Sequence, residues 1–156
     1  NNGKNIYQFT HARDLSRLCY LASLENKSEI YNCGAKDRSN MFNILNELCS
    51  FSKTNSKVKS VPFWPAVFLM NIFSFLGLSP LGSYHSLMYG RSLYFDMEKN
   101  KKNLGWEPEF TNFDMFLESY KWFLDEQKQN YVNGMSKYQH QSMVNEGVLA
   151  LLKRLL

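Results

Sequence analysis

The chain has 156 residues, 44% of them apolar, so it is long enough for one compact domain and short for two. Eighteen basic and fourteen acidic residues give a formal charge of +4 without a Lys/Arg block, which argues against a nucleic-acid-binding protein. The three cysteines and three histidines lack metal-ligand spacing and a disulfide pattern, so we expect no metal, buried thiols and a cytoplasmic location. Asn1 replaces an initiator methionine, which suggests part of a longer protein.

The first third of the chain predicts strands alternating with helices. Residues 5–10 are β-branched and aromatic, as in a short strand, and residues 14–24 have apolar side chains at helical spacing. Residues 29–33 predict a second strand, and Ser39 is expected to cap the helix that follows it.

An uncharged apolar stretch occupies residues 61–78. Pro62, Pro65 and Gly77 interrupt it, and its length is borderline against the roughly 20 apolar residues that a bilayer span needs. A membrane span, a helix seated on a membrane surface and a buried helix remain open, and the buried helix is favoured.

After a loop, residues 92–95 predict another strand, and Asp96 begins a short lysine-rich helix. Gly105 suits a left-handed cap at the end of that helix, and Pro108 prevents its continuation.

The last third predicts two helices joined by a polar connector. Residues 113–124 are amphipathic, residues 125–138 are polar, and residues 144–156 have a leucine-rich face. We therefore expect a main part over residues 1–127, and a connector with a C-terminal amphipathic helix over residues 128–156.

Several short motifs stand in the order found in one enzyme family. Tyr7-Gln-Phe-Thr-His-Ala-Arg-Asp-Leu15 is similar to an "aromatic, x, His, x, x, Asp, Leu" segment, and Glu29-Ile-Tyr-Asn-Cys-Gly34 to a "Val-Tyr-Asn-Ile-Gly" strand. Asp96-Met-Glu-Lys99 and Leu104-Gly-Trp-Glu-Pro108 resemble "Asp, x, x, Lys" and "Leu-Gly-Trp, x, Pro". Together these segments resemble the NAD(P)-dependent epimerase/dehydratase family, the extended short-chain dehydrogenases, over residues 3–127.

The resemblance implies an α/β fold: the C-terminal portion of an extended short-chain dehydrogenase, with the last strand and helices of a Rossmann-type sheet and a small mixed substrate lobe. It also implies NAD or NADP in the full-length parent. The family's glycine-rich turn and its Tyr-x-x-x-Lys pair are missing from this sequence. We therefore expect no cofactor to bind this chain alone, no catalytic residue within it, and a partner N-terminal nucleotide-binding half.

Five residues are the candidates for substrate binding. Arg13 and Arg91 are planar, fork-like donors that suit the diphosphate of a nucleotide sugar, although Arg91 lies closer to Asp96 than the family pattern implies. Tyr84, His85 and Tyr89 belong to a loop that such enzymes fold over the substrate.

Three other conspicuous residues are expected to be structural. His11 and Asp14 stand at a helix start, where capping is the simpler role, and Trp106 is expected in the core with its indole N–H bonded locally.

Three functions remain open. The favoured one is the substrate-binding portion of a sugar-nucleotide epimerase, dehydratase or reductase. The second is part of a membrane-associated oxidoreductase resembling 3β-hydroxysteroid dehydrogenases, attached through residues 61–78. The third is a non-catalytic chain that binds partners and forms homo-oligomers through an exposed apolar patch.

Overall fold

The computed structural model describes residues 2–77 and 83–133, and the side chains among these up to residue 125. The described residues form six helices. They are α1 (Ala12–Ser23), α2 (Met41–Ser52), α3 (Phe63–Phe75), α4 (Ser83–Met88), α5 (Glu98–Leu104) and α6 (Asn112–Asn133).

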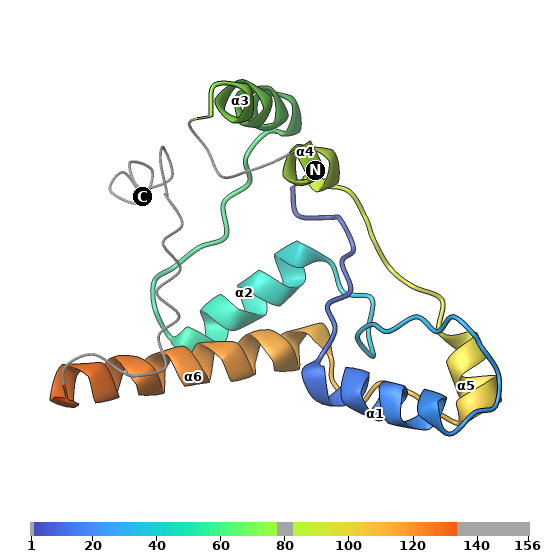
Figure 1. The fold of residues 1–156 in the computed structure, drawn as a ribbon. Coiled ribbons are helices and arrows are strands. Elements are labelled where there is room, and N and C mark those ends of the chain that lie inside the picture. Colours follow the sequence, from blue (N-terminus) through green and yellow to red (C-terminus); the bar gives the residue numbers. More distant parts are fainter. Residues whose placement is uncertain (1, 78–82, 134–156) are drawn as a thin grey trace.

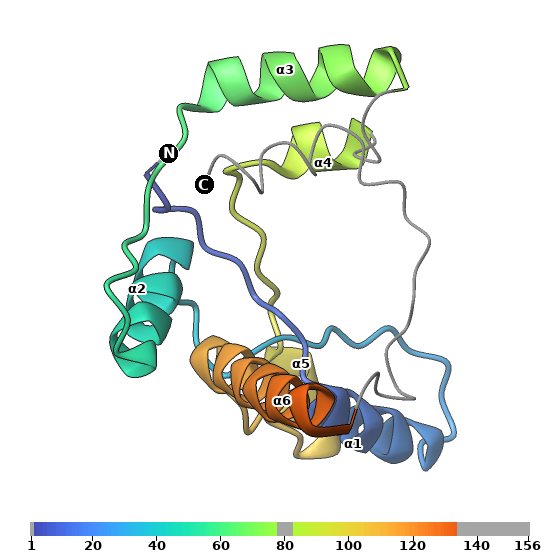
Figure 2. The same ribbon diagram turned by 90° about the vertical axis from the view of Figure 1, so that its left-hand side faces the viewer.

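The helices lie in two groups joined by extended segments (Figure 1). One group contains α1, α2, α5 and α6, and α2 packs against α6. The other contains α3 and α4, which pack against each other and lie apart from the first group in both views (Figure 2). The extended backbone of residues 2–10, 53–62 and 89–97 connects the groups.

The expected α/β fold with part of a Rossmann-type sheet is wrong, because the described residues form no strand or sheet. Among the described residues, two of the segments expected as strands meet at one isolated bridge, Tyr7 with Leu93, and a second isolated bridge joins Ile6 to Asn40, the residue before α2. Gln8 N–H donates to the Leu93 carbonyl at 3.1 Å and Leu93 N–H donates to the Ile6 carbonyl at 2.8 Å. Two such bonds do not make the continuous ladder that defines a strand pair.

Buried side-chain amides take the place of strand neighbours. The Gln8 amide donates to the Ala35 carbonyl at 2.8 Å and accepts from Phe95 N–H at 2.7 Å. The Asn112 amide accepts from Phe9 N–H and donates to the Tyr7 carbonyl, both at 2.9 Å. Backbone groups that a sheet would pair are thus satisfied by side chains.

Residues 29–33 also make hydrogen bonds with side-chain amides where a sheet would supply a neighbouring strand. The Asn100 amide nitrogen donates to the Asn32 carbonyl at 2.6 Å, and the Asn32 amide donates to the Asp96 carbonyl at 3.0 Å. This segment therefore stays extended beside α5 without becoming a strand.

The helices expected from local sequence within the described residues are confirmed, with one shifted cap, but the loop expected to contain Tyr84 and His85 is wrong because these residues lie in the helix α4. His11 caps α1 through Nδ1, which accepts Arg13 N–H at 3.2 Å. Asn40, not Ser39, caps α2, because its side-chain oxygen accepts Asn43 N–H at 2.8 Å. Gly105 ends α5 in the left-handed region with a φ of 59°.

The apolar segment forms the helix α3, but the expected burial is wrong because none of its residues is buried. Trp64 is 78% and Phe75 90% exposed. No helix in the described part of the chain has the length and apolar character to cross a bilayer.

Helix α6 continues to Asn133, through the expected boundary between residues 127 and 128 and into the polar connector. The helix expected over residues 144–156 lies outside the described residues.

The core of the described part is small. Its buried apolar side chains are Leu18, Ala35, Ile44 and Trp106. Many large apolar side chains of the same residues are exposed, which leaves apolar surface for contacts beyond the chain.

Candidate functional site

A cleft of about 800 Å³ lies where three segments meet: the N-terminal residues, the start of α3 and the turn after α4. Its lining consists of two cations, two aromatic rings and small polar groups: Asn2, Lys4, Asn5, Phe63, Trp64, Gly90, Arg91 and Ser92. No acidic side chain lines it.

Aromatic packing fixes the side of the cleft that holds Arg91. The rings of Phe63 and Tyr89 stack with centroids 6.1 Å apart, and the Tyr89 hydroxyl donates to the Val61 carbonyl at 3.4 Å. Gly90 then turns the chain with a φ of 64°, a conformation that favours glycine. Arg91 is thereby held beside the start of α3.

The opposite side is fixed by the first turn of α2, whose N–H groups have no partner within the helix. Met41 N–H donates to the Asn5 carbonyl at 3.1 Å, and Phe42 N–H donates to the Gly3 carbonyl at 2.9 Å. Gly3 has a φ of 69°, and a Cβ there would lie 2.8 Å from the Phe42 Cβ. This close approach requires glycine and places Lys4 at the cleft.

The chemistry of the cleft suits an anion that also has a flat ring. Lys4 and Arg91 are exposed, and Trp64 presents most of its indole to solvent. A diphosphate can be bound by an ammonium and a guanidinium, and a heterocyclic base can stack on an indole.

An apolar pocket of about 400 Å³ adjoins the cleft and shares Asn2, Asn5 and Gly90 with it. Its apolar lining comes from α2 and the segment before α3: Met41, Phe42, Leu45, Val58 and Val61. A ligand in the cleft could therefore extend an apolar group between α2 and that segment.

Four of the five predicted substrate residues lie on α4 or directly after it, and the fifth, Arg13, lies on α1. Arg91 lines the cleft and Tyr89 lines the adjoining pocket. Tyr84 and His85 lie on α4, with ring centroids 6.0 Å apart. A side-chain hydrogen bond with Tyr84 is the main cause that raises the pKa of Tyr7, so Tyr84 is directed toward the N-terminal segment.

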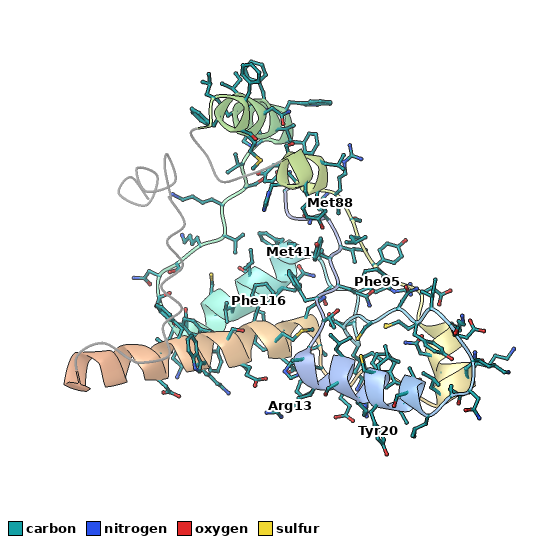
Figure 3. All side chains as sticks on the ribbon, in the orientation of Figure 1. Arg13, Tyr20, Met41, Met88, Phe95 and Phe116 are labelled. Carbon is teal, nitrogen blue, oxygen red and sulfur yellow. The ribbon has the colours of Figure 1, made fainter. Side chains whose placement is uncertain are left out.

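Arg13 is distant from these four residues. It lies on α1, whereas Met88 marks α4 in the other helix group (Figure 3). Its guanidinium is 3.9 Å from the Glu118 carboxylate and 5.9 Å from the centre of the Phe110 ring, and its side chain is 75% exposed. These are surface contacts, and they leave Arg13 outside the cleft.

His11 and Asp14 have the structural roles expected of them. Both ring nitrogens of His11 are engaged, one by Arg13 N–H and the other by the Glu118 carboxylate at 3.0 Å. The buried Asp14 carboxylate accepts the N–H groups of Glu109 and Phe110 at 3.1 Å.

Sequence reasoning missed Lys4, Phe63 and Trp64 as cleft residues. Lys4 belongs to no motif, and the aromatic pair looked like core because α3 is apolar throughout. One signal could have indicated that these rings lie at a surface site: both follow Pro62 at the very start of the helix, a few residues after the basic Lys59.

The described residues also show which features of metal and dinucleotide sites they form. No three residues of the His, Cys, Asp and Glu types there could hold a metal ion together. A strand followed by a glycine-rich turn and a helix start, which a dinucleotide pyrophosphate requires, is not formed by residues 2–77 or 83–133.

The cysteines are free thiols, and the expectation that they are buried is wrong, since none of the three is fully buried. Cys19 is exposed, whereas Cys33 and Cys49 are partly buried.

The chain is similar to one curated protein of larger size, the uncharacterized protein y4nG of Sinorhizobium fredii. The two are 41% identical over 150 residues, which cover 96% of this chain and 37% of the relative. This chain thus spans a little over a third of the relative's length. No protein-family model matches the chain, and no solved structure matches it.

Proposed function

We propose that this chain is the substrate-binding portion of a longer NAD(P)-dependent epimerase, dehydratase or reductase that acts on a sugar nucleotide. The observation that supports this most is the acid-free cleft in which Lys4 and Arg91 lie beside Trp64. The two cations bind the diphosphate, and the indole stacks on the base.

The contacts between motif segments also support the proposal. The segment containing His11 and Asp14 and the segment containing Leu104-Gly105-Trp106 carry the strongest resemblance to the family. They lie against each other, because Trp106 Nε1–H donates to the Asp14 carbonyl at 3.2 Å and the Asp14 carboxylate binds the backbone just after it.

The division of labour follows from which residues are present. This chain sets the choice of substrate, and hydride transfer belongs to a cofactor-binding part outside it. The greater length of the relative leaves room for such a part.

The test is a titration of the full chain with uridine diphosphate, followed by tryptophan fluorescence. Trp106 is buried and Trp64 is exposed in the cleft, so quenching should disappear in Trp64→Phe. Arg91→Ala and Lys4→Ala should each weaken binding about tenfold, since a charge-assisted bond contributes roughly 1.5–3 kcal/mol at most.

Arg13→Ala is the matched control, because it removes another exposed guanidinium, which lies outside the cleft. Its affinity should equal that of the unaltered chain. The proposal fails if uridine diphosphate does not bind, if uridine binds equally well, or if Arg13→Ala weakens binding as much as Arg91→Ala.

A second candidate is an apolar substrate of the steroid class, which the 400 Å³ pocket between α2 and Val61 favours. A steroid titration in which Leu45→Glu abolishes binding, with uridine diphosphate inert, would support it over the sugar nucleotide.

A further inference from the structure

Eleven of the thirteen residues of α3 are apolar, and the described part of the chain covers one side of the helix more fully than the other, where Ile72 is partly buried. Phe63, Ala66, Val67, Met70 and Phe73 are partly buried and share the side packed toward α4. A helix that is hydrophobic all round is normally covered all round. The second side of α3 therefore needs an occupant.

The more exposed side is mainly aromatic, with Asn71 as its polar member. Trp64, Phe68 and Phe75 follow one another at spacings of four and seven residues, which places them along one face of the helix. Phe68 is 65% and Phe75 90% exposed, and Leu69 and Leu76 extend the surface.

The charge around this surface has one sign. Between residues 48 and 95 there are four basic residues and no acidic one, so this segment accounts for the whole formal charge of +4. Lys57 and Lys59 are exposed just before α3, and Arg91 is exposed just after α4. An apolar helix face beside basic residues, with no acidic residue in the same segment, complements a surface that is both apolar and negatively charged.

We propose that α3 lies flat on an anionic lipid bilayer, with Trp64, Phe68 and Phe75 inserted at the boundary between headgroups and acyl chains. Lys57 and Lys59 contact the lipid phosphates and carboxylates. Thirteen residues extend about 20 Å, short of the roughly 30 Å hydrocarbon core, so α3 rests in the interface and does not cross it.

Trp64 takes part in both proposals, because it lines the cleft and also lies on the exposed face of α3. Phe68 and Phe75 are outside the cleft lining, so substituting them tests the membrane without altering the cleft. If uridine diphosphate does not bind, the vesicle-binding experiment still tests the membrane proposal, because the two measurements use different ligands and different variants.

The experiment is cosedimentation of the full chain with vesicles of phosphatidylcholine containing roughly one-third phosphatidylserine, compared with pure phosphatidylcholine. The chain should bind the anionic vesicles preferentially, and added salt should release it. The double variant Phe68→Ser/Phe75→Ser should reduce partitioning at least tenfold. Lys57→Gln/Lys59→Gln should reduce it roughly 25-fold, because each lysine near an anionic surface contributes about fivefold.

Matched controls come from α6 and α5. Trp122→Ser/Phe123→Ser removes two exposed rings, and Lys102→Gln/Lys121→Gln removes two exposed charges elsewhere. Both should bind vesicles like the unaltered chain, and circular dichroism should show that all variants keep their helices. The proposal is overturned if neither vesicle type is bound, or if the controls lose binding equally. It is also overturned if Phe68→Ser/Phe75→Ser only dissociates an oligomer, because the face would then join copies of the chain.

Discussion

The indole nitrogen of Trp106 donates a 3.2 Å hydrogen bond to the backbone carbonyl of Asp14, a residue 92 positions earlier. Trp106 is 1% exposed, and Asp14 is 2% exposed. This contact fixes α1 against the segment after α5, and the stability of the larger helix group depends on it.

Trp106→Phe should lower the free energy of unfolding by about 2 kcal/mol, because it removes the indole hydrogen bond and leaves a small cavity. Urea denaturation followed by circular dichroism measures this loss. Trp122→Phe, at an exposed position on α6, should change stability by less than about 0.5 kcal/mol. Equal losses in the two variants would contradict the assigned role of Trp106.

Asp14→Ala should cost roughly 2 kcal/mol, since the partly buried N–H groups of Glu109 and Phe110 would lose their acceptor. The same urea experiment applies. Asp125→Ala removes an exposed carboxylate from α6 and should be nearly neutral. A stable Asp14→Ala variant would show that water replaces the carboxylate.

The start of α6 should make stability pH-dependent. Hydrogen bonds from the Thr111 hydroxyl and N–H to the carboxylate, at 2.6 and 2.9 Å, lower the pKa of Asp114 below its ordinary 3.8. The carboxylate therefore stabilises the fold fully above pH 3.8, and this contribution disappears as the pH falls through the lowered pKa.

Asp114→Asn should lower the unfolding free energy by less than about 1 kcal/mol at pH 7, and the difference should vanish in acid. Thermal melts of both chains between pH 7 and pH 2.5 would show this convergence. A constant difference across the range would argue against the carboxylate as its cause.

The thiols should differ in reactivity with a maleimide. Burial is the main cause that raises the pKa of Cys33, with the Asp14 charge contributing, whereas Cys19 is exposed. The thiolate is the reactive form, so Cys19 should be labelled first and Cys33 at least tenfold more slowly. Mass spectrometry of Cys19→Ser should show that the fast phase is lost. A fast phase that survives this substitution would contradict the assignment.

Local signals in the sequence predicted five of the six described helices, and α4 was expected as a loop. His11 and Gly105 set the start of α1 and the end of α5, because a cap needs only the backbone within a few residues of itself. The helix start predicted the cap that His11 forms, and the size of the ring predicted the burial of Trp106. The partners were not predictable: the indole N–H of Trp106, expected to bond locally, donates to a carbonyl 92 positions earlier, and the Asp14 carboxylate binds the N–H groups of Glu109 and Phe110.

Only the tertiary structure decided which extended segments remain unpaired, what covers α3, and where the cleft forms. A strand needs backbone partners from distant parts of the chain, and here the amides of Gln8 and Asn112 supply them instead. The apolar pattern of α3 predicts a helix but not its neighbours, and it packs against α4 on one side alone. Lys4 and Arg91 lie 87 positions apart in the sequence and meet in one cleft because Gly3 packs on α2 and Tyr89 stacks on Phe63.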